Sequence, residues 1–134
     1  MNKVMPFLIC ACLTTSCATY HLSNQSLLEQ FSDRRTETKV IILIAPPYVF
    51  FPGFVKGNDL RAITCLDQHE KENVIPVTRR TGVRITKKDG TRTTFYFDTL
   101  LLKDSTISGS KTHFFNAPIH PIRLGDIRKI EIQK

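Results

Sequence analysis

The chain has 134 residues, four cysteines, no tryptophan and a formal charge of +7 at pH 7. This length is enough for one domain with a core of its own and too short for two such domains. The positive charge favours anionic partners, which include lipid head groups, lipopolysaccharide, acidic glycans and nucleic acid.

The first sixteen residues have the layout of a secretory signal peptide. Lys3 provides a short positive region, Val4 to Leu13 is an uncharged and mostly apolar run, and small residues follow at positions 14–16. The apolar run has about half the length that a permanent membrane-spanning helix requires. We therefore expect residues 1–16 to be a signal peptide.

Cys17 directly follows these small residues, and this arrangement resembles the lipobox of bacterial lipoproteins. The resemblance implies that Cys17 receives a diacylglyceryl group and becomes the new N-terminus, with several acyl chains forming a stable anchor. A competing box at residues 9–12 would place the lipid on Cys12. Two further hypotheses are a signal cleaved without acylation and an N-terminal strand or helix with the composition of a leader. If Cys17 is acylated, Cys65 is the one free thiol of the mature chain. One thiol cannot form an internal disulfide, so the mature domain needs none.

Residues 17–39 are expected to form a tether that contains one short helix. The sequence Ser26-Leu27-Leu28-Glu29 is typical of a capping box, in which Ser26 caps the helix and Glu29 reaches back to it. A helix of about ten residues is too short to persist alone in water, so it should dock on the rest of the protein. Its apolar stripe would consist of Leu27, Leu28 and Phe31.

Val40 to Val55 is a run of uncharged residues between two lysines. It is shorter than a membrane-spanning helix, and Pro46-Pro47 and Pro52-Gly53 would break any helix within it. We expect a buried strand over Val40–Ala45, then a proline turn and a second apolar segment packed on the core. Two rival hypotheses are partial insertion into a bilayer surface and an exposed patch for a partner.

Residues 40–134 are expected to form a single β-rich domain. Arg61–Asp67 and Val74–Thr78 flank a charged turn and are typical of a hairpin. A second hairpin, within residues 82–102, turns at Asp89-Gly90.

The loop length of this second hairpin decides which side chains share a face. A two-residue loop would place Ile85 opposite Thr94, whereas a three-residue loop with Gly90 in the left-handed position places Val83 opposite Phe95. The three-residue loop, Lys88-Asp89-Gly90, separates apolar from polar side chains and is the predicted register. It puts Val83, Ile85, Phe95 and Phe97 on one face and Arg84, Arg92 and Tyr96 on the other.

Five short strands are expected between residues 82 and 134, the most barrel-like part of the chain. Short, bent strands joined by tight turns are typical of a small, partly open SH3-like or Sm-like barrel, within a mainly β fold. The patterns "VRITKKDG", "ISG" and "IRLGDIRKIEI" also resemble a C-terminal module seen in short bacterial lipoproteins of uncharacterised function. This resemblance implies a fold and no chemistry, and no RNA-binding residue is carried over from the Sm-like family.

Residues that could support chemistry are scattered. His113 and His120 flank a loop at a spacing that is not typical of a metal site, and acidic residues occur singly apart from two in one turn. Cys65 belongs to an alternating strand pattern, so we expect it to be buried and unreactive. No catalytic residue, metal or cofactor is predicted.

We therefore expect a lipid-anchored, exported protein of the bacterial cell envelope, at the outer membrane rather than the inner one. It would act as a binding or structural module and not as an enzyme. Its partners would be the membrane, through Cys17, and an anionic lipid or glycan, through Arg84, Arg92 and Tyr96. A small envelope hydrolase, or an Sm-like nucleic-acid binder if the chain stays in the cytoplasm, are the rival hypotheses.

Overall fold

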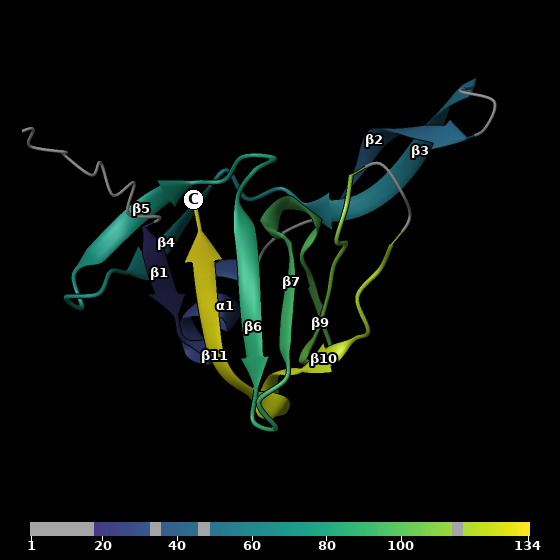
Figure 1. The fold of residues 1–134 in the computed structure, drawn as a ribbon. Coiled ribbons are helices and arrows are strands. Elements are labelled where there is room, and N and C mark those ends of the chain that lie inside the picture. Colours follow the sequence, from purple (N-terminus) through teal and green to yellow (C-terminus); the bar gives the residue numbers. More distant parts are fainter. Residues whose placement is uncertain (1–17, 33–35, 46–48, 114–116) are drawn as a thin grey trace, which may run out of the picture.

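A six-stranded antiparallel sheet forms the body of the protein, with the strand order β5-β4-β1-β11-β6-β7 (Figure 1). The computed structural model describes residues 18–32, 36–45, 49–113 and 117–134. The predicted mainly β fold is confirmed. The strands of the large sheet are β1 (Thr19–Leu22), β4 (Ala62–Leu66), β5 (Glu72–Pro76), β6 (Gly82–Lys87), β7 (Arg92–Tyr96) and β11 (Ile127–Gln133).

A smaller three-stranded sheet lies beside it and has the order β10-β9-β8. Two short 3-10 helices join the sheets, since η1 leads from β7 into β8 and η2 leads from β10 into β11. Residues 82–134 thus contain six strands in the described part, one more than expected, because η1 ends β7 and starts β8 as a separate strand. The elements are η1 (Phe97–Thr99), β8 (Leu101–Lys103), β9 (Thr106–Ser108), β10 (Ile122–Arg123) and η2 (Leu124–Asp126).

The β6–β7 hairpin has the predicted register. Val83 lies opposite Phe95 and Ile85 lies opposite Thr93. Gly90 has a φ of 87°, which is the left-handed conformation that the three-residue loop requires. The predicted β4–β5 hairpin is confirmed as well. The four apolar side chains of the predicted inner face are all buried: Val83, Ile85, Phe95 and Phe97.

The helix α1 (Asn24–Phe31) begins earlier than the sequence indicated. The cap is Ser23 and not Ser26, because the Ser23 hydroxyl accepts a hydrogen bond from the backbone N–H of Ser26. Glu29 does not reach back to the cap, and its carboxylate accepts a hydrogen bond from Gln25.

The same helix packs on the core, as expected for so short an element. Leu27 and Phe31 are buried, and the Phe31 ring meets the Phe97 ring edge to face at 6.0 Å. Leu28, expected in the same stripe, is 37% exposed. The side-chain amide of Gln30 both donates to and accepts from the backbone of Thr64, at 2.9 and 2.8 Å, so it pairs with β4 as a strand would.

Residues 19–22 were not predicted as a strand, yet β1 lies in the middle of the large sheet, between β4 and β11. All four of its residues pair with β11. The stretch expected to serve as a tether therefore contains a central strand and a core helix.

The apolar stretch forms a two-stranded ribbon of β2 (Thr36–Ala45) and β3 (Val49–Asn58), which projects from the body (Figure 1). The strands pair with each other, and β3 contacts the body mainly at η1 and β8. Phe54 is 70% exposed. The strand expected over Val40–Ala45 is present. The segment projects from the body, whereas we expected it to pack on the core. It can do so because each strand of the ribbon obtains its backbone partners from the other.

Candidate functional site at one end of the large sheet

Four strands of the large sheet end at the same level. The pairing register aligns Thr19 with Gln133, Gln133 with Gly82, and Gly82 with Tyr96, in one row across β1, β11, β6 and β7. We call this edge the Thr19 end of the sheet. The chain enters the sheet here two residues after Cys17, and its last residue, Lys134, directly follows this row.

Two exposed arginines lie next to the Thr19 end of the sheet, and a third lies at the end of β5. Arg79 and Arg80 lie in the turn that leads into Gly82, and both are exposed. The carbonyl of Arg61 accepts a hydrogen bond from the N–H of Val77, which places Arg61 beside the end of β5. None of these three arginines forms an ion pair with a residue that the structure describes.

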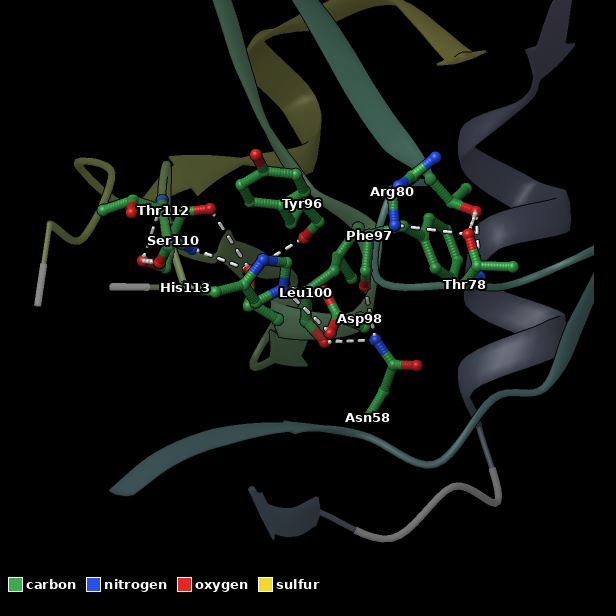
Figure 2. Close-up of polar contacts among 12 residues, drawn as sticks. Asn58, Thr78, Arg80, Tyr96, Phe97, Asp98, Leu100, Ser110, Thr112 and His113 are labelled. Carbon is green, nitrogen blue, oxygen red and sulfur yellow. Dashed lines mark hydrogen bonds and ion pairs between the residues drawn. The ribbon is translucent and has the colours of Figure 1, made fainter. Parts of the chain in front are cut away.

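The base of the β2–β3 ribbon is attached to the same end through Asn58. Its side-chain amide donates to the carbonyls of Phe97 and Leu100, both at 2.8 Å (Figure 2). Its side-chain oxygen accepts from the N–H of Leu60. Asn58 is 3% exposed. Phe97 directly follows Tyr96 of the aligned row, so the ribbon leaves the body beside the Thr19 end.

A buried hydrogen-bonded pair, Asp98 and His113, lies next to this attachment. Nε2 of His113 is 2.9 and 3.0 Å from the two carboxylate oxygens of Asp98, to which its N–H donates (Figure 2). The two side chains are 11% and 8% exposed. The ring of Tyr96 stacks on the imidazole with the centroids 4.1 Å apart. The pair thus joins the loop after β9 to η1.

Short hydrogen bonds hold the surroundings of this pair in place. The Thr99 hydroxyl donates to the Tyr96 carbonyl at 2.7 Å and accepts from the N–H of Ser110 at 2.8 Å. The Ser110 hydroxyl in turn donates to the Thr112 carbonyl. Fifteen residues separate Asp98 from His113, and sequence reasoning missed the pair because neither residue belongs to a motif that points to the other.

A carboxylate-held imidazole can act as a general base or as a metal ligand, but either role needs further groups. Among the residues that the structure describes, no three His, Cys, Asp or Glu side chains are grouped as metal ligands. Two surface hollows in the described part lie on the β1–β4–β5 side of the sheet, away from this pair. The contact between Asp98 and His113 holds the loop after β9 on the body.

The larger hollow, of about 240 Å³, contains His21 and Glu72. In the pairing register Leu66 lies between them, since it pairs with His21 on one side and Glu72 on the other. Two strand spacings separate His21 from Glu72, about 10 Å. Among the described residues, no hydrogen bond or ion pair joins His21 to Glu72.

The predicted contact residues Arg84, Arg92 and Tyr96 share the outer face of the hairpin, but they do not converge. Four residues of extended strand separate Arg92 from Tyr96, about 13 Å. Arg84 lies opposite Glu131, whose pKa is held below its usual value by a hydrogen bond from Lys129 and by the nearby charges, Arg84 among them. Their contact with an anionic lipid or glycan stays a prediction.

The cysteines divide between two parts of the chain. Cys10, Cys12 and Cys17 lie outside the described residues. Cys65 is 2% exposed, which confirms that it is buried, and burial raises the pKa of its thiol to about 11.

Comparison with protein-family models, curated proteins and solved structures finds no match. Within the described ranges, no helix has the length and apolar character needed to cross a membrane.

Proposed function

We propose that the protein is a lipid-anchored domain of the bacterial cell envelope, held at the outer membrane by acylated Cys17. It acts there as a binding or structural module and not as an enzyme. The observation that carries this proposal is the short connection between Cys17 and the folded sheet, which starts at Thr19. Two residues of chain span at most about 7 Å. A lipid on Cys17 would therefore hold the Thr19 end directly against the membrane.

The charges around this end support the proposal. Arg79 and Arg80 are exposed and lie three and two residues before Gly82, which belongs to the row that Thr19 begins. Basic side chains close to an anionic surface are each worth about 1 kcal/mol of attraction. The arginines would add to the anchor and would orient the sheet with its Thr19 end toward the head groups.

We further propose that residues 82–134 form a small, partly open barrel of the SH3-like or Sm-like kind. In support, β11 pairs with β6, and β8, β9 and β10 form a second sheet that η1 and η2 connect to the first. In such a barrel a few bent strands contribute to both sheets. This arrangement would give the anchored module a rigid body with little room for an enclosed pocket.

Mass spectrometry of the mature N-terminus tests the anchor. We expect cleavage before Cys17, a mass increase that corresponds to acyl chains, and recovery of the protein in the membrane fraction. The Cys17→Ala variant should lose the added mass and leave the membrane fraction, whereas Cys12→Ala should change neither. A full-length, unacylated protein in the cytosol would refute the proposal.

A further inference from the structure

We infer that the β2–β3 ribbon is a membrane-contact element that inserts its apolar part into the head-group and upper acyl region of an anionic leaflet. This inference rests on the proposed function, because the anchor at Cys17 would bring the ribbon to the membrane. The ribbon would thus be a binding site for an anionic lipid surface, although it is part of neither sheet of the body.

The composition of the ribbon favours an apolar environment. No charged residue occurs from Val40 to Val55. The six paired positions from Val40 to Ala45 and their partners from Val49 to Phe54 extend for about 20 Å of strand. Phe54, whose side chain is described, is 70% exposed. Exposed apolar side chains that gather in a patch usually mark an interaction surface.

The charged residues at the base of the ribbon identify the occupant as an anionic surface. In the register Lys56 pairs with Thr38 and the next pair is Lys39 with Val55, so both lysines are at the level where the apolar part begins. Around this base five basic residues outnumber three acidic ones, Glu37, Asp59 and Asp98, of which Asp98 is hydrogen-bonded to His113. The basic set is Lys39, Lys56, Arg61, Arg79 and Arg80.

A second copy of the chain fits this base less well than a membrane. Pairing two ribbons would bring two sets of basic residues together, and like charges at close range repel. An anionic leaflet would neutralise the same residues. The excess of positive charge therefore favours lipid over self-association.

The open edges of the ribbon limit how deeply it can enter. In the hydrocarbon core, unpaired N–H and C=O groups of a sheet edge cost several kcal/mol each. At the boundary between head groups and acyl chains, water still reaches such groups. We therefore expect insertion to a depth of about 5–10 Å, as for interfacial elements, and not a transmembrane hairpin.

Tryptophan fluorescence measures this depth directly, because the natural chain has no tryptophan. Phe51→Trp puts the probe within the apolar part of the ribbon, opposite Leu43. Val74→Trp is the matched control, on an exposed position of β5. With anionic vesicles we expect a blue shift for Phe51→Trp only, and stronger quenching by lipids brominated near the head group than by lipids brominated near the chain end.

A charge-reversal variant tests the lysines at the base of the ribbon, Lys39 and Lys56. We expect Lys39→Glu/Lys56→Glu to lower the affinity of the unacylated protein for anionic vesicles by at least about tenfold, since each basic residue contributes to the attraction. The control is Lys88→Glu/Lys103→Glu, two exposed lysines outside the ribbon and the Thr19 end, which should retain the affinity.

Running the fluorescence test on both acylated protein and Cys17→Ala separates the two proposals. Acylated, vesicle-bound protein with an unquenched Phe51→Trp would overturn the ribbon inference and leave the anchor intact. Quenching of Phe51→Trp in the Cys17→Ala background would support the ribbon independently of the anchor, whereas a protein that keeps Cys17 and carries no acyl chain would refute the anchor. A blue shift of Phe51→Trp without vesicles, together with a doubled molecular mass, would overturn the inference in favour of a second copy.

Discussion

Gly109 lies directly against the ring of Phe95. A Cβ atom at position 109 would be 2.5 Å from Cδ2 and 2.8 Å from Cε2 of that ring. Phe95 belongs to β7 and is buried in the core, so its ring has little space into which it could move. Gly109 is required here because of close packing.

We predict that Gly109→Ala lowers the free energy of unfolding by about 1–3 kcal/mol, the usual cost of overpacking a core. Gly125→Ala is the control, since no atom lies within 4 Å of a Cβ at that position. Urea unfolding of both variants measures the difference. Equal stability of the two variants would show that the Phe95 ring can move aside.

His113→Phe should also destabilise the protein, although it keeps an aromatic ring next to Tyr96. The change removes the N–H that donates to Asp98, and losing a partner of a buried carboxylate costs about 1–3 kcal/mol. The loop at residues 111–117 should then be cleaved faster by proteases in the native state. His69→Phe, in an exposed turn, is the control and should change neither measurement.

Cys65 should resist thiol reagents in the native protein and react once the protein is unfolded in urea. Burial raises its pKa from 9.0 to about 11, so the folded state holds the thiol proton more tightly than the unfolded state does. Stability from this group is therefore complete below pH 9 and is lost as the pH rises toward 11. We expect Cys65→Ala to have a flatter dependence of unfolding free energy on pH over that interval. Fast labelling of the native protein would contradict the burial.

Two double variants compare the Thr19 end with the outer face of the hairpin. We predict that Arg79→Glu/Arg80→Glu weakens binding of the unacylated protein to anionic vesicles about tenfold or more, because both arginines would face the head groups. Arg84→Glu/Arg92→Glu should have the smaller effect on vesicles, since Arg84 lies beside Glu131 and Arg92 is at the far end of β7. Vesicle sedimentation at low salt measures both, and a reversed order would assign the membrane contact to the outer face.

Patterns within a few residues predicted much of the large sheet. The alternation in β6, β7 and β11 and the position of Gly90 were enough to predict the hairpin register and the buried side chains. These features follow from the two-residue period of a strand and from the turn geometry, both of which are local. The leader and the acylation of Cys17 also rest on a short linear pattern, and they stay predictions.

Such local patterns could not predict contacts between segments that are distant in the sequence. The central place of β1, the Asp98–His113 pair and the close approach of Gly109 to Phe95 each depend on residues that meet only after the sheets have packed. The ribbon illustrates the same limit, because an apolar strand pattern is identical whether the strand enters the core or leaves it. The sequence of each element shows the period of its apolar residues. Which elements become neighbours is decided by how side chains from many elements pack together.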